Sequence, residues 1–180
     1  MSKCTTTYTL TSVAEDCLLS KGGITELYVT KFNELTDGFY TINGEEITID
    51  AEKMGTVYQI FVRPNQTQYT TDYQSETANG LPVYSTTLSF NMMRMSKEKR
   101  IEVMALLSNE IAMMVKDKNG EYHFIGASAS CEAVDGTVAS TGLSKADINQ
   151  YSVNLKCDEA FLPIILSETE AEAIKSKITA

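Results

Sequence analysis

The sequence predicts a mainly β protein: a β-sandwich or barrel with one central flanking α-helix, a long extended hairpin arm and a short C-terminal helix. The 180-residue chain contains 21 Thr, 15 Ser and 9 Tyr but only 3 Pro, a bias that suits half-exposed strands. Short runs of alternating polar and apolar residues recur between turn signals, and only two segments carry strong helix signals. Hydrophobic residues make up 43% and charged residues 22%, so we expect one globular domain over residues 1–180.

The N-terminal part is expected to form strands joined by tight turns. Strands are predicted at residues 5–10 and 24–30, where Thr, Tyr and β-branched residues alternate. A compact hairpin is predicted around Asn43-Gly44, because both residues tolerate the positive φ of a two-residue type I′ turn.

Two further strands, at residues 56–63 and 83–90, are expected to pair with each other. In the second strand Tyr84, Leu88 and Phe90 share one face, while Ser and Thr residues occupy the other. This alternation predicts a sheet with one dry and one wet side.

Residues 64–82, between these strands, are predicted to form an extended loop or arm. From residue 57 to residue 90 the only charges are Arg63, Asp72 and Glu76. A loop of this length in a compact domain is usually functional or disordered. We expect the arm to be mobile in a free monomer and to become ordered at an oligomer interface, where the candidate contact residues are Gln66, Gln68, Tyr69, Tyr73 and Gln74.

The central helix is predicted to begin after Ser96, a good N-cap, and to end near residue 108. Its expected packing stripe contains Ile101, Met104, Ala105 and Leu107 or Ser108, and Asn109 is expected as a left-handed stop. A second hairpin is predicted around Asn119-Gly120, and a last strand at residues 148–157.

The C-terminal helix, residues 167–180, is predicted from the capping box Ser167-x-x-Glu170. A helix this short is marginal alone and must dock on its own domain or on a neighbour. Ala171, Ile174 and Ile178 form its apolar stripe, and Ile174 and Ile178 are therefore further candidate interface residues.

Charge disfavours duplex binding as a main activity, because 24 acidic and 15 basic residues give a net charge of −9. The same net charge would suit a surface that lies near DNA without binding it, and it would equally suit a protein that is simply soluble. No apolar run approaches a membrane span, and we expect a protein that is made in the cytosol with its four cysteines reduced.

No catalytic, cofactor or metal constellation is recognisable in the sequence. His123 is the only histidine and lies mid-strand, far from any nucleophile motif, so we expect it to have a surface or packing role. Phosphate-loop, dinucleotide and zinc-protease motifs are absent. The basic residues Arg94, Lys97, Lys99 and Arg100 mark either a solvated helix start or a contact with an acidic neighbour. We expect a structural protein, not an enzyme.

The order of elements resembles the tail-tube family of bacteriophages and the related tube proteins of type VI secretion and contractile injection systems. The resemblance rests on V-Y-Q-I-F-V, Y-S-T-T-L-S-F, S-K-E-K-R-I-E-V-M-A-L-L, V-K-D-K-N-G-E-Y-H-F-I-G and T-G-L-S-K-A-D-I-N-Q-Y-S-V-N-L. In addition, C-L-L-S-K-G-G-I-T-E-L-Y-V is similar to structural proteins of phages that infect Bacteroidetes.

This resemblance implies hexameric rings whose inner strands close into one barrel around a lumen, with rings stacking into a tail assembled in the host cytoplasm. The implied partners are further copies, other virion proteins and DNA in transit, with no membrane. A ring, tail-hub or adaptor protein of a short-tailed phage is an alternative. From another class, a small-molecule-binding β-barrel would need apolar residues facing a closed pocket on nearly all strands.

Overall fold

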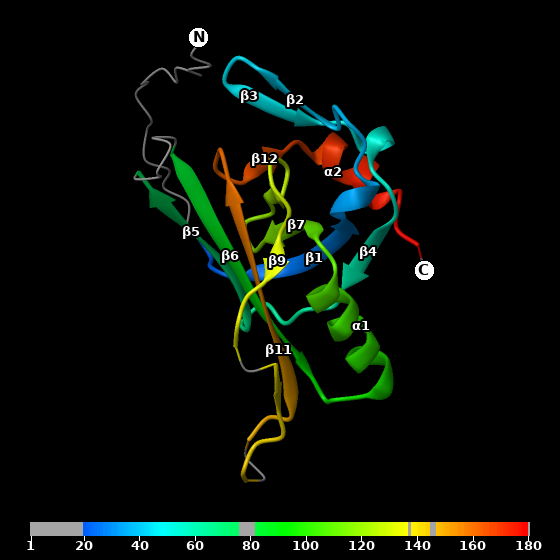
Figure 1. Cartoon of the computed structure of the whole chain (residues 1–180), viewed down its shortest axis with the longest axis vertical. Helices are drawn as coiled ribbons and strands as arrows, with labels where there is room; N and C mark the ends of the chain where they lie inside the picture. The colour runs from blue at the N-terminus through cyan, green and yellow to red at the C-terminus, as the bar shows by residue number, and fades with distance from the viewer. Residues whose placement is uncertain (1–19, 76–81, 137, 145–146, 180) are drawn as a thin grey trace.

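The computed structural model describes residues 20–75, 82–136, 138–144 and 147–179, and the strand expected at residues 5–10 lies outside them. Two sheets pack face to face, confirming a β-sandwich with few helices (Figure 1). A separate two-stranded hairpin stands at the top of the view, and one helix lies along the lower right flank.

Sheet 1 is antiparallel, with strand order β12-β8-β7-β1-β4. Its strands are β1 (Ile24–Lys31), β4 (Val57–Ile60), β7 (Ile111–Asp117), β8 (Tyr122–Ile125) and β12 (Ile164–Leu166). The first five residues of β7 are all buried, because both faces of this sheet are covered.

Sheet 2 is longer and has strand order β10-β11-β6-β5, with β9 also paired to β11. Its strands are β5 (Thr67–Gln74), β6 (Val83–Met93), β9 (Glu132–Ala133), β10 (Ala139–Ser140) and β11 (Gln150–Glu159). Along β6 the residues Thr86, Leu88, Phe90 and Met92 are buried, which confirms the predicted dry and wet sides.

Two apolar cores result, one on each face of sheet 1. The first lies between the sheets and includes Leu27, Met113 and Leu155. The second includes Tyr28 and Phe124 and lies beneath the C-terminal helix and the separate hairpin. Sheet 1 is therefore the middle layer of the molecule.

The separate hairpin, β2 (Tyr40–Asn43) and β3 (Glu46–Ile49), is confirmed, but its turn is shifted by one residue. Asn43 pairs with Glu46, so Gly44 and Glu45 are the two turn residues. Gly44 has φ +68°, whereas among the described non-glycine residues only Arg94 has a positive φ. A positive φ at the first turn position alone indicates a type II′ turn instead of the expected type I′.

Short 3₁₀ turns, η1 (Phe32–Glu34) and η2 (Ala51–Lys53), connect the hairpin to the sandwich.

The expected pairing of residues 56–63 with residues 83–90 is wrong. Strand β4 pairs with β1, whereas β6 pairs with β5 on one side and with β11 on the other. The expected arm at 64–82 is correspondingly shorter, because residues 67–74 form β5. The alternation of side chains along a strand explains the difference. Thr67, Tyr69 and Thr71 face the core, so a segment of polar composition can still form a strand of the sandwich.

Helix α1 (Lys97–Ser108) begins as predicted, with the Ser96 hydroxyl accepting from the Lys99 amide. Most of the predicted packing stripe is wrong: Val103 and Leu106 are buried, whereas Ile101 is 59% and Met104 is 52% exposed. Of the predicted stripe, Leu107 is partly buried and packs on the first core. Asn109 is extended, with φ −116°, and its side-chain amide donates to the Ala105 carbonyl instead of adopting a left-handed stop.

Helix α2 (Glu168–Lys175) confirms the capping box, with the Ser167 and Glu170 side chains each bonding the other's backbone amide. It docks on its own domain, where Ile174 is 1% exposed. Ile178 packs on the same core and forms a bridge with Val57. Ile174 and Ile178 were candidate interface residues, but both pack on the core of their own chain.

A polar network holds the other side of α2. The ammonium of Lys175 donates to the Tyr122 hydroxyl and lies 3.7 Å from Glu26 Oε2, to which the Tyr28 hydroxyl also donates. Although burial opposes it, hydrogen bonds with Tyr122 and Glu172 raise the pKa of Lys175 above its ordinary value. These contacts fix α2 against β1 and β8.

We expect Ile174→Ala to lower the free energy of unfolding by about 2–5 kcal/mol, because the truncation leaves a cavity in the second core. Thr169→Ala, at an exposed position of the same helix, is the control and should change it by less than about 0.5 kcal/mol. Urea denaturation followed by circular dichroism measures both. Equal stabilities of the two variants would contradict the docked position of α2.

Candidate assembly surfaces

Strand β5 is a long sheet edge that the described residues leave uncovered. The other outer strands are protected or short. Backbone bonds join Val57 of β4 to Lys177 and Thr179, while β12 has three residues and β10 has two. Strand β5 has eight residues, and no described strand pairs with its outer side. Natural proteins usually shield such edges, because unpaired backbone groups are a template for another strand.

The candidate residues of the expected arm fall on both faces of this edge. Tyr69 faces the sandwich interior, and Tyr73 follows it on the same side. Tyr73 is 61% exposed and contacts Tyr84 at a tilted angle, with ring centroids 5.4 Å apart. Gln68 and Gln74 lie on the outer face. The structure therefore places four of the five candidates on one strand, split between two surfaces, while Gln66 precedes that strand.

The outer face of sheet 2 is a polar surface built from rows of neighbouring residues. One row contains Gln68, Ser89 and Asn154, and the next contains Thr70, Thr87 and Lys156. Its charged members among the described residues of β5, β6, β9 and β11 are Asp72, Glu132, Lys156 and Asp158. Lys156 pairs with Asp158 at 3.2 Å, so the face carries few charges and is acidic on balance.

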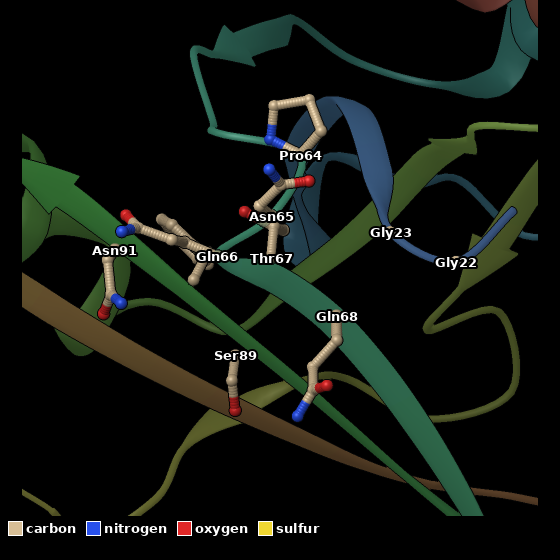
Figure 2. A pocket seen from close by; sticks show the side chains of 10 residues that line it. Gly22, Gly23, Pro64, Asn65, Gln66, Thr67, Gln68, Ser89 and Asn91 are labelled. Carbon is tan, nitrogen blue, oxygen red and sulfur yellow. The ribbon is translucent and has the colours of Figure 1, made fainter.

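An uncharged cleft of about 670 Å³ lies at the start of β5. Figure 2 shows the side chains of Gln66, Gln68, Ser89 and Asn91 gathered where β5 begins beside β6. The Gln66 Oε1 atom is buried and has no hydrogen-bond partner. The cleft thus offers amides and a hydroxyl but no charge among its lining residues.

Close backbone packing forms one wall of this cleft. Gly23 has φ +111°, and a Cβ atom there would lie 2.3 Å from the Pro64 carbonyl oxygen. Lys118 braces the same corner, because its amide donates to the Gly23 carbonyl and its ammonium to Asn65 Oδ1. Glycine at position 23 is therefore required where β1 passes the link between β4 and β5.

His123 lies between the sheets at this open side. Its ring centroid is 5.5 Å from that of Tyr69, and its Nε2 atom is 4.0 Å from Asp117 Oδ2. Burial lowers the pKa of His123, against the opposing charges of Asp117 and Glu121. A half-buried ring packed on Tyr69 agrees with the expected packing role.

Glu159, on the inner face of β11, links sheet 2 to residues 127–128, which follow β8 of sheet 1. Its carboxylate is 1% exposed and accepts from the Ala127 amide at 2.7 Å and the Ser128 amide at 3.3 Å, while its Oε2 atom has no partner. Burial raises the pKa of Glu159 despite these donors. This contact was not predicted from the sequence, since an acidic residue at the end of a strand is normally expected to be exposed.

Two of the four cysteines lie in the described residues, and both are buried free thiols, as expected. Cys131 and Cys157 belong to the first core, and the Cys157 thiol donates to the Ala129 carbonyl. A hydrogen bond with Cys157, together with burial, raises the pKa of the Cys131 thiol. Cys4 and Cys17 lie outside the described residues.

Within the described ranges, no group of three His, Cys, Asp or Glu side chains is placed to hold a metal ion. No helix in that part of the chain is long and apolar enough to cross a membrane.

Comparison of the chain with family models, curated proteins and solved structures gave no match. The resemblance to tail-tube proteins accordingly remains a hypothesis that rests on the order and turn chemistry of the elements.

The raised pKa of Glu159 predicts how the free energy of unfolding depends on pH. A carboxyl with a raised folded pKa contributes stability that is fully present below its unfolded pKa, near 4.5, and is lost as the pH rises through the folded value. We expect Glu159→Gln to remove that loss, so the variant's unfolding free energy should fall less than the wild type's from pH 4.5 to neutral. Urea denaturation at a series of pH values measures the difference.

Asp158→Asn is the matched control of opposite sign. A hydrogen bond from Ser85 lowers the pKa of Asp158, partly against burial, so this carboxylate stabilises the fold above its unfolded pKa near 3.8 and loses that effect as the pH falls. Parallel stability curves for wild type and Glu159→Gln would show that the link between the sheets has no titrating role.

Proposed function

We propose that the chain is a structural virion protein, not an enzyme, that self-assembles through the edge of β5 into rings and a tail tube for DNA passage. The observation that carries the proposal is the eight-residue edge strand that the described residues leave uncovered. Rings, their hexameric number and the tail location in a virion assembled in the host cytoplasm come from the family resemblance.

Edge pairing would supply both energy and direction. Each added ladder hydrogen bond contributes about 0.5–1.5 kcal/mol net, so a strand along β5 gains several such bonds with one register. Asp72 is the only charged residue in β5, and Tyr73 offers exposed ring surface beside it. An edge that pairs with a different surface of the next copy makes a heterologous contact, which closes into a ring when the rotation allows.

The polar face of sheet 2 supports the conduit in this proposal. DNA that moves through a lumen must break each contact that it makes, so Lys and Arg on the wall would slow it. On this face Lys156 is the single described cation of β5, β6, β9 and β11 and it is paired with Asp158. A hydroxyl- and amide-rich wall with an acidic balance suits passage without binding.

A ring or tail-hub protein of a short-tailed phage would use the same edge with another symmetry. The small-molecule barrel finds less support, because the space between the sheets is filled by the buried side chains of the first core. The cleft beside Gln66 lies instead at the start of β5, and its lining residues include Gln68 and Ser89 of the outer face.

We expect the double substitution Gln68→Lys/Thr70→Lys to prevent assembly while leaving the subunit folded. Both residues are exposed on β5, and lysines on an edge strand oppose strand addition. Removing residues 66–79 is a poorer test, because it would also remove Thr67, which is 3% exposed in the sandwich. Negative-stain imaging and sedimentation velocity measure the outcome.

Asn154→Lys is the matched control, since it adds a lysine in the same row of the outer face but two strands away from the edge. The control should still assemble. Rings or tubes from the double variant, or a wild-type protein that remains monomeric at all concentrations, would overturn the proposed function.

A further inference from the structure

Cys131 and Cys157 lie opposite each other on two neighbouring segments of sheet 2. Strands β9 and β11 pair in antiparallel register, with Glu132 opposite Lys156 (Figure 1). One further step along this register sets Cys131 opposite Cys157. Directly opposite residues project from the same face of a sheet, and both cysteines do belong to the first core.

The backbones do not bond each other at this position of the ladder. The amide of Cys131 donates to the Ile111 carbonyl at 2.7 Å, and its carbonyl accepts from the Ile111 amide at 3.1 Å, so both groups face β7. The bond from the Val134 amide to the Asn154 carbonyl has the matching phase. Opposite residues at such a non-hydrogen-bonded position have Cα atoms about 4.5 Å apart. Cysteines at that spacing lie within the range that a disulfide can span, about 4.4–6.8 Å.

The two thiols also interact in the reduced protein. A hydrogen bond with Cys157 raises the pKa of the Cys131 thiol, and the Cys157 thiol donates to the Ala129 carbonyl at 3.0 Å. The Cys131 side chain is tightly packed, because a Cβ atom on Gly126 would lie 3.0 Å from its sulfur atom. Side chains that are already held beside each other lose little further rotamer freedom when they are joined.

We propose that Cys131 and Cys157 are a site of disulfide formation that joins β9 to β11. The oxidant is a small-molecule disulfide such as oxidised glutathione. One cysteine thiolate attacks it and releases one molecule of reduced thiol. The second cysteine then attacks the mixed disulfide, releases the other molecule and completes the protein disulfide. Two electrons pass from the two cysteine sulfurs to the oxidant, and the two thiol protons end on the released thiols.

Burial determines when this reaction can occur. Cys131 is 0% and Cys157 is 1% exposed, so an oxidant cannot reach either sulfur in the closed fold, and burial also disfavours the attacking thiolate. The disulfide therefore forms while the chain folds or opens locally, and the same burial then protects it from reducing thiols. We expect free thiols in a reducing compartment and the disulfide in an oxidising medium.

The disulfide would strengthen the connection between the two sheets. Cys131 is bonded through both backbone groups to Ile111 of sheet 1, and Cys157 belongs to β11 of sheet 2. Joining them closes a loop that contains residues 132–156, which restricts the unfolded chain more than the folded one. The equilibrium constant for unfolding should fall about a hundredfold. This site is separate from the β5 edge, so its test does not depend on assembly.

The test compares disulfide formation in the folded and in the unfolded chain. Cys4→Ser/Cys17→Ser leaves only the proposed pair of cysteines. This variant is refolded, or held unfolded in urea, in buffers of reduced and oxidised glutathione. Trypsin cleaves after Lys156, between the two cysteines, so mass spectrometry of the linked peptides quantifies the disulfide. We expect the effective concentration of one thiol at the other to be about a hundredfold higher in the folded chain, in step with the stability gain.

Adding Cys157→Ser to the same variant is the control, and it should give only mixed disulfides with glutathione. The wild-type protein should yield the same linked peptides, so the test does not depend on one variant. Urea denaturation gives a second measurement, in which the oxidised protein should have the higher midpoint. An effective concentration in the folded chain no higher than in urea, or oxidation that does not raise the midpoint, would overturn the proposal.

Discussion

Burial of sheet 1 on both faces is the constraint on which the rest of the fold depends. Leu27 and Met113 face sheet 2, while the alternate residues Tyr28 and Met114 face the opposite way. Neither set can meet water without loss of apolar burial, so each face needs its own cover. Sheet 2 covers one face. The C-terminal helix and the β2–β3 hairpin cover the other, which explains why α2 is docked within its own chain.

Sheet 2 is the cover and therefore has only one face to bury. Its outer face can be polar, and its length is not limited by sheet 1. The edges then differ in protection: backbone bonds of Lys177 and Thr179 cover Val57 at the start of the short strand β4, whereas no described strand covers β5. Among the described residues, this polar strand with its single charge presents an edge that is competent to pair.

Local signals in the sequence predicted local structure. The caps at Ser96 and Ser167 and the hairpins at Gly44 and Gly120 depend on neighbouring residues alone, and the structure confirms these elements. The predicted strand pairing was wrong because pairing is not a local property. Nothing within residues 56–63 indicates that β1 is their partner.

The predicted packing face of α1 was wrong for a related reason. The helix is apolar on two sides, and contacts with distant strands decide that Val103 and Leu106 are buried instead of Ile101 and Met104. Residues 67–74 were expected to lie in a loop because their composition is polar, although Thr67, Tyr69 and Thr71 alternate with period 2, as in a strand. An uncovered edge is a property of the whole sheet, so no local pattern can reveal it.

Net charge sets the conditions under which such an assembly can form. Copies that each carry −9 repel one another, and salt screens this repulsion over about 8–10 Å at physiological ionic strength. Ladder bonds along β5 gain little from opposite charges, so salt favours that contact by reducing repulsion. In the proposed assembly, added salt should therefore lower the protein concentration at which rings form through β5.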